Sequence, residues 1–100
     1  MAQVFISFAS QDMEAARQVY ETLSGSVDCW FAPESVPPGS HFAEDIANSI
    51  RQCQILVLLW SAHAARSPHV EREIGLGCDA KLLVIPIKLD ATPYGSQQAY

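Results

Sequence analysis

The segment SPHVEREIGLG, at residues 67–77, carries two carboxylates and an imidazole at a spacing that could serve a reaction. On a helix, His69 and Glu73 lie four positions apart and share one face, whereas Glu71 points elsewhere. A carboxylate can stabilise developing positive charge, and an imidazole can stack on a flat ring. However, Glu71 and Glu73 flank the apolar stripe symmetrically, so both could be solvated acids beside Arg72. Helical geometry alone leaves open which glutamate, if either, takes part in chemistry.

The elements that must position this segment alternate between strand and helix. Four apolar, β-branched or alternating runs predict strands at residues 3–8, 27–31, 55–60 and 82–90. Between them, amphipathic runs that follow Ser10 and Ser40, and one from about Ser67 to Asp79, predict three helices. Strands and helices that alternate through short connections predict an α/β fold with a doubly wound parallel sheet.

Individual residues refine this arrangement. Ser10 is expected to cap the first helix, and Ser40 the second. The fully apolar run ILVLLW, at residues 55–60, predicts the centre of the sheet. Pro86 lacks a backbone donor, which favours an edge strand or a strand end for residues 82–90.

Ligands of such sheets bind beyond the carboxyl ends of the strands, where the strand order reverses. Three segments are expected to meet there, at residues 8–12, 32–39 and 61–73. The middle one, within APESVPPGS, is rich in proline and therefore predicts a loop of constrained shape.

Composition limits the possible partners and compartments. The chain has 100 residues, enough for one domain, and a net charge of −5, which disfavours binding to nucleic acid or to an anionic membrane surface. It shows neither a long apolar run nor a signal sequence, so we expect a cytoplasmic protein. Cys29, Cys53 and Cys78 are too far apart for a structural metal site, and reduced, buried thiols are expected.

Several enzyme classes fail on their motifs. The first turn, FASQD, lacks the glycines of a dinucleotide-binding or P-loop site. The ends of the first and third predicted strands lack the acidic residues of a phosphoacceptor domain. A GxSxG elbow and an HExxH motif are also missing, so the three histidines, His41, His63 and His69, are expected at the surface or in loops.

Three blocks together resemble a known family. They are VFISFASQD, CWFAPESVPPGSHFAEDI and LLWSAHAARSPHVEREI, in this order. This combination is similar to a bacterial TIR (Toll/interleukin receptor) domain over about residues 3–90, so we expect a TIR domain at residues 1–90 and a tail at residues 91–100. The resemblance implies a flavodoxin-like sheet. TIR domains of this type ordinarily continue into a fifth strand and a last helix, which we expect this chain to lack.

The resemblance also implies a function. Many bacterial TIR domains cleave NAD⁺ as glycohydrolases or cyclases and are activated by self-association, whereas others are non-catalytic interaction modules. The family's catalytic glutamate lies in a pattern resembling Trp-x-x-x-Glu, which places Glu73 at the catalytic position and His69 at the tryptophan position. In the proline-rich loop, Glu34 and Ser35 replace the common Arg-Asp. The resemblance is compatible with both functions.

The remaining expectations follow from the same resemblance. NAD⁺ would be the substrate, with neither a cofactor nor a metal. Residues expected to bind it, besides His69, are Phe8, Ala9, Ser10 and Trp30. Residues expected to cover the site or contact a second copy are Pro37, Pro38 and Gly39. The expected partners are NAD⁺, other TIR domains in a homo-oligomer and a fused or separate sensor domain.

Overall fold

The computed structural model describes residues 3–31 and 42–93 of the chain. In chain order, its elements are β1 (Val4–Ser7), the 3-10 turn η1 (Ser10–Asp12), α1 (Met13–Ser24), β2 (Cys29–Trp30), α2 (Phe42–Gln52), β3 (Ile55–Trp60), α3 (Ala62–Ala65), α4 (Pro68–Asp79) and β4 (Leu83–Lys88). This order confirms the predicted alternation of strands and helices. Pro37, Pro38 and Gly39, and the predicted cap at Ser40, lie outside the described residues.

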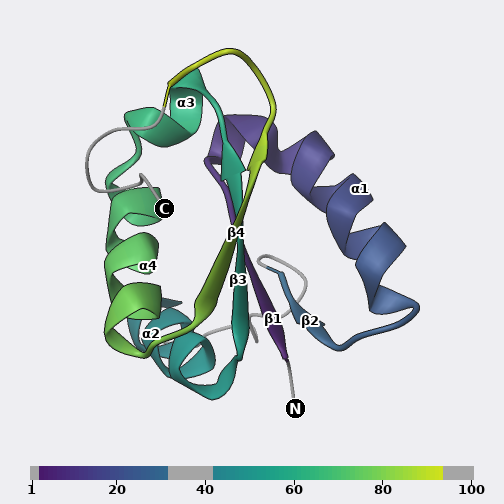
Figure 1. Cartoon of the computed structure of the whole chain (residues 1–100), viewed down its shortest axis with the longest axis vertical. Coiled ribbons are helices and arrows are strands. Elements are labelled where there is room, and N and C mark those ends of the chain that lie inside the picture. Colours follow the sequence, from purple (N-terminus) through teal and green to yellow (C-terminus); the bar gives the residue numbers. More distant parts are fainter. Residues whose placement is uncertain (1–2, 32–41, 94–100) are drawn as a thin grey trace.

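The four strands form one parallel sheet in the order β2-β1-β3-β4. Helix α1 covers one face, and α2 and α4 cover the other (Figure 1). The order matches that of flavodoxin-like sheets, and it confirms the predicted doubly wound fold. Among the described strands, β3 lies inside the sheet and β4, which contains Pro86, lies at one edge, as predicted.

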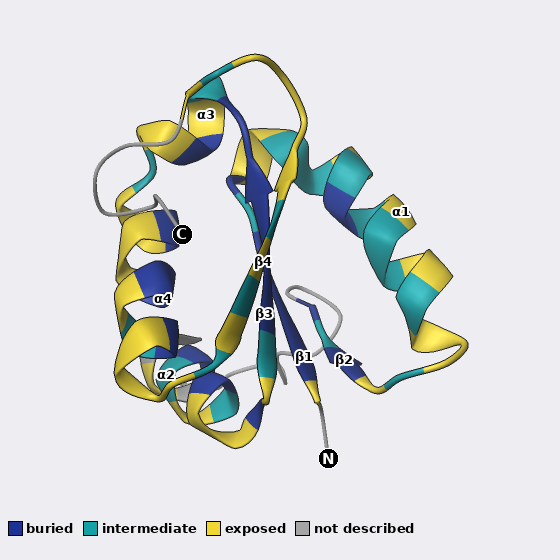
Figure 2. Ribbon diagram, in the orientation of Figure 1, coloured by how far each residue is buried: buried dark blue, intermediate teal, exposed yellow. Residues whose placement is uncertain are grey.

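The pleat of β1 divides the buried side chains between two cores. Phe5 packs with residues of α2 and α4, whereas Ile6, the next residue, packs on the face covered by α1. Figure 2 shows β1 and most of β3 buried between these layers. Because both faces of the central strands are covered, their sequences are almost entirely apolar.

Helix α1 begins later than expected, so the prediction that Ser10 caps it is wrong. Ser10 starts the 3-10 turn, and its hydroxyl donates to Gln11 Oε1 at 3.3 Å. The backbone closes that turn itself, because the Asp12 amide donates to the Ala9 carbonyl at 2.8 Å. Helix α1 then starts at Met13 without a side-chain cap.

The cysteines differ in their exposure. Cys29 and Cys53 are buried, and burial raises the pKa of both thiols, to about 11 for Cys53. Cys78 is exposed, which corrects the expectation that all three thiols are buried. It lies beside Gly77, one of the α4 residues that face the sheet, and its own side chain is on the solvent side.

The exposed surface shows two further features. As expected, His63 and His69 are exposed, while His41 lies outside the described residues. Alternate residues of β4 and the position after it are exposed and apolar: Leu83, Ile85, Ile87 and Leu89. Within residues 3–31 and 42–93, no helix is long and apolar enough to cross a membrane.

Candidate functional site

Helix α4 brings Glu73 onto the sheet and leaves Glu71 in solvent. The helix starts sharply, because the Ser67 hydroxyl accepts from the Val70 amide at 3.3 Å and Pro68 occupies the first turn. Glu73 is 8% exposed, so it is buried, whereas Glu71 is exposed. Tertiary packing thus separates two carboxylates that the helical wheel could not distinguish.

A glycine on the same face lets α4 approach the sheet. Gly77 follows Glu73 by one turn, and a β-carbon there would lie 2.8 Å from Leu56 Cδ1 of β3. That distance is too short for an unadjusted contact, so glycine permits the close packing of helix on strand. The close approach carries the Glu73 side chain to the carboxyl end of β1.

The carboxylate meets a hydroxyl at that point. Ser7, the last residue of β1, is fully buried, and its Oγ donates to Glu73 Oε1 at 2.7 Å. Ser7 was not among the residues predicted from the sequence. The sole signal was a polar side chain in the otherwise apolar strand VFIS, and nothing local indicated a partner 66 residues away.

Burial changes the acidity of this carboxyl group. Removal from water raises the pKa of Glu73 to about 7, while the Ser7 hydroxyl and, more weakly, the Arg72 charge act in the opposite direction. Near neutral pH the group therefore exists both as acid and as carboxylate. Carboxyl groups with a pKa shifted in this way are common at functional sites.

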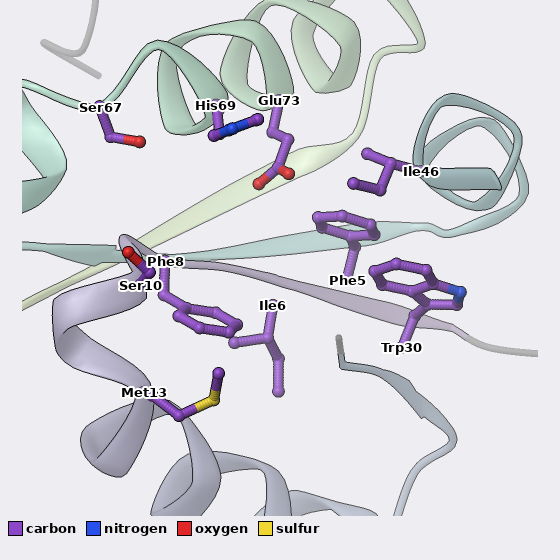
Figure 3. Close-up of a pocket in the computed structure, with 10 residues that line it drawn as sticks. All are labelled: Phe5, Ile6, Phe8, Ser10, Met13, Trp30, Ile46, Ser67, His69 and Glu73. Carbon is purple, nitrogen blue, oxygen red and sulfur yellow. The ribbon is translucent and has the colours of Figure 1, made fainter. Parts of the chain in front are cut away.

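Glu73 faces a pocket of about 320 Å³ at the carboxyl end of β1. This volume is at the lower end of the range for small-molecule sites. Figure 3 shows the carboxylate directed from α4 toward the strands, with the His69 ring beside it. The pocket lining comes from five helices and strands and from the turns between them: Phe5, Ile6, Phe8, Ser10, Met13, Trp30, Ile46, Ser67, His69 and Glu73.

Aromatic rings make up much of the wall. The rings of Phe5 and Trp30 stack with centroids 4.9 Å apart and planes inclined by 9°. On the other side of β1, Phe8 stacks on Phe31 at 5.4 Å. A buried carboxylate among aromatic faces suits a flat ligand that carries positive charge, because the carboxylate and the ring faces both attract cations.

The pocket brings together most of the residues expected to bind substrate. Phe8, Ser10, Trp30 and His69 all line it with Glu73. Ala9 is buried in the core and does not line the pocket. Trp30 is half-buried, which leaves part of its ring accessible from the pocket. Of the other lining residues, Phe5, Ile6, Met13 and Ile46 were not anticipated, since apolar side chains carry no signal that separates a pocket from a core.

A second serine and carboxylate pair lies near the carboxyl end of the neighbouring strand. The buried Ser61, which follows β3, donates from Oγ to Asp12 Oδ2. Ser61 Oγ also accepts a hydrogen bond from the Ala64 amide at 3.1 Å, which caps α3. This pair ties the turn after β1 to the segment after β3, and it does not line the pocket.

The charged side chain of Asp90 also holds the loop after β4. Asp90 accepts from the amides of Ala62, at 3.0 Å, and Thr92, at 2.9 Å. Hydrogen bonds from Thr92, and then from the Ala62 amide, lower the pKa of Asp90 to about 2. The described part of the chain contains no group of three or more histidine, cysteine or acidic residues that could hold a metal ion.

Comparison with known proteins identifies the family. A family model described as a TIR domain matches residues 4–99. This chain belongs to the TIR domain family. The match agrees with the resemblance seen in the three sequence blocks. The boundary expected at residue 90 stays a prediction.

A curated plant relative is also similar. The chain is 29% identical, over 94 residues, to a protein of Brachypodium distachyon named probable 2′ cyclic ADP-D-ribose synthase BdTIR. The alignment covers 91% of this chain and 42% of that protein, so this TIR domain spans less than half the length of its relative.

Solved TIR structures share the fold. The TIR domain of the Toll-related receptor TRR-2 from Hydra magnipapillata superposes with a TM-score of 0.84 at 18% identity, over 96% of this chain and 77% of that one. The TIR domains of the activated Roq1 resistosome give a TM-score of 0.78 at 17% identity, over 88% and 57%. A metazoan TIR-STING receptor from C. gigas gives a TM-score of 0.73 at 20% identity, over 86% of this chain and 30% of that one. The bacterial type expected from the sequence stays a prediction.

Proposed function

We propose that this TIR domain is an NAD⁺ glycohydrolase or cyclase that cleaves the bond between nicotinamide and ribose, with Glu73 as its catalytic residue. One observation carries the proposal: a buried carboxylate, held by Ser7, faces an aromatic pocket at the carboxyl end of β1. The plant relative named as a probable cyclic ADP-ribose synthase supports the same chemistry.

The reaction needs little from the protein. Nicotinamide on ribose is already cationic, so the C–N bond breaks with its electron pair going to the ring nitrogen and no proton is required. Positive charge builds on the anomeric carbon, as in glycoside hydrolysis. The Glu73 carboxylate would stabilise that charge and accept hydrogen bonds from the ribose hydroxyls. Water, or a hydroxyl or ring nitrogen of the same molecule, then attacks the carbon and loses a proton, which gives ADP-ribose or a cyclic isomer.

The pocket walls would orient the leaving group. The rings of Phe8 and Trp30, which line the pocket, would offer flat apolar surfaces to the nicotinamide. His69 stands where a stacking tryptophan is expected, at the exposed rim above the pocket. Its smaller ring would still stack, although over less area.

Self-association would be part of the activity. The structural neighbours include TIR domains within an activated resistosome. We propose that assembly of several copies activates this domain, and that Pro37, Pro38 and Gly39 take part in the contact. If the domain binds its own kind but leaves NAD⁺ intact, it is instead an interaction module, the second function that the sequence left open.

Nicotinamide release from NAD⁺ by concentrated protein tests the proposal. Glu73→Gln keeps the size of the side chain but removes the charge, and it should lower kcat by about 100-fold or more. Glu71→Gln is the matched control on the same helix and should stay within about threefold of the wild type, because Glu71 is exposed. If the wild type does not cleave NAD⁺ at concentrations where it self-associates, the proposed activity is wrong. If Glu71→Gln is inactive, the assignment of Glu73 as the catalytic glutamate is wrong.

A further inference from the structure

We propose that Ser7 is a positioning residue for NAD⁺ cleavage: its hydroxyl aims the Glu73 carboxylate into the pocket and favours the charged form of that group. This inference rests on the proposed function and assigns a role to a residue that does not itself line the pocket. It is carried by the contact between the end of β1 and the middle of α4.

The position of Ser7 leaves water little access to the hydrogen bond. Ser7 is fully buried, and in the parallel ladder it lies opposite Leu58 of β3. Pairing with β3 therefore fixes its backbone, and β2 pairs with Val4 and Phe5 earlier in the same strand. A donor held this rigidly determines where Glu73 Oε1 lies, at 2.7 Å from Ser7 Oγ. Because Glu73 lines the pocket, its other oxygen, Oε2, would be the one available to a ligand.

Few other charges act on Glu73. On its own helix, Arg72 is exposed and His69 lies one turn earlier. Strands β1 and β3 have no charged residue. Of the charged residues of α2 whose side chains are described, Glu44 and Arg51 are exposed and line a separate shallow groove with Ala47 and Asn48. Among the described residues, the Ser7 hydroxyl is thus the neutral donor that offsets the burial of the carboxylate.

The chemical effect of that donor is directional. A hydroxyl that donates to a carboxylate stabilises the charged form, so it lowers the pKa that burial has raised. Removing it would leave a buried carboxylate without this donor, and the group would hold its proton to higher pH. The reaction requires the charged form, so the dependence of cleavage on pH should change with Ser7.

The test compares Ser7→Ala with Ser7→Thr and Ser61→Ala. Ser7→Thr retains the hydroxyl and suits a strand. Ser61→Ala removes the other buried serine hydroxyl, which bonds Asp12 instead of Glu73. Two measurements are made on each folded variant: the pH profile of kcat/KM for NAD⁺, and the titration of the Glu73 carboxyl carbon by 13C NMR without substrate. Glu73→Gln assigns that resonance by its disappearance.

The expected result is specific to Ser7. In Ser7→Ala the titration midpoint of Glu73 moves upward by roughly one pH unit. The same change lowers kcat/KM about tenfold at pH 6, with a much smaller loss at pH 9. Ser7→Thr restores most of the wild-type profile, and Ser61→Ala leaves the midpoint of Glu73 in place.

Two outcomes separate the inference from the proposed function. An active wild type whose Glu73 midpoint is unchanged in Ser7→Ala, or a loss in Ser7→Ala that is equal at every pH, overturns the role of Ser7 alone. A wild type that leaves NAD⁺ intact overturns the proposed function, and with it any positioning role in that reaction, even if the NMR titration shifts.

Discussion

Two serine and carboxylate pairs lie at the carboxyl ends of the two central strands. Ser7 and Glu73 join β1 to α4, and Ser61 and Asp12 join the segment after β3 to the turn after β1. Both serines are buried and both donate to a carboxylate oxygen. The chemistry of the two contacts is the same, but their surroundings differ.

The surroundings decide what each pair can do. Glu73 is buried and faces a pocket with aromatic walls, so its charge is costly and available to a ligand. Asp12 is only partly buried, and its serine also caps α3, so that pair fixes the ends of two elements. A hydrogen-bonded carboxylate at the end of a strand is therefore not enough to mark a site. Burial against an open pocket is the feature that separates the two pairs.

The largest expected difference between the pairs is in the pH dependence of stability. The pKa of Glu73 is raised from 4.5 to about 7 in the folded protein. Folding therefore favours the protonated form, and this contribution is fully present below about pH 4.5 and is lost as the pH rises through 7. The Glu73→Gln variant cannot ionise at this position, so its stability should not fall in this way. From acidic pH to pH 8.5, the free energy of unfolding of the wild type should therefore fall by up to about 3 kcal/mol more than that of the variant. Urea unfolding at several pH values measures this.

Asp12→Asn is the control from the other pair. It leaves Glu73 in place, so it should keep the wild-type decline in stability from acidic to alkaline pH. If the stability of Glu73→Gln falls with pH in parallel with that of the wild type, burial does not raise the pKa of Glu73. The contrast between the two pairs then disappears.

A smaller effect is expected from the structural pair. Ser61→Ala removes the cap of α3 and the donor to Asp12, and it should lower the free energy of unfolding by about 1–2 kcal/mol. Nicotinamide release should stay within about twofold of the wild type once the protein is folded. A variant that keeps full stability but loses cleavage would assign Ser61 to the site and not to the scaffold.

The smallest effect concerns the rim of the pocket. His69→Trp enlarges the ring one turn before Glu73 and should lower KM for NAD⁺ by about two- to tenfold through added stacking, with little change in kcat. His69→Ala is the opposite control and should raise KM. Steady-state kinetics on the three proteins decide the point. An unchanged KM in both variants would show that the ligand does not reach this end of α4.

Patterns within one segment predicted the fold well. Period-two and period-3.6 hydrophobicity located the four strands and the amphipathic helices, including the bounds of α4 to within one residue at Ser67. Pro86 correctly indicated that β4 lies at an edge among the described strands. The cap at Ser10 was the main local error, because a backbone turn at Ala9 and Asp12 competed with the side chain for the same amides.

The candidate site was only partly predictable. Spacing paired His69 with Glu73, and family resemblance favoured Glu73 over Glu71, but neither showed that one is buried and the other exposed. Burial depends on how closely α4 packs on β3, which Gly77 permits. Ser7 escaped notice because a serine in a strand gives no local sign of its partner.

By itself, the sequence determined the alternation of elements, the family and the helix that carries the candidate carboxylate, since these follow from local periodicity and short motifs. The tertiary structure alone decided that Glu73 is the buried glutamate, that Ser7 donates to it and that aromatic rings from separate strands surround it. Those properties depend on contacts between residues far apart in the chain, and such contacts exist only once the helix lies on the sheet.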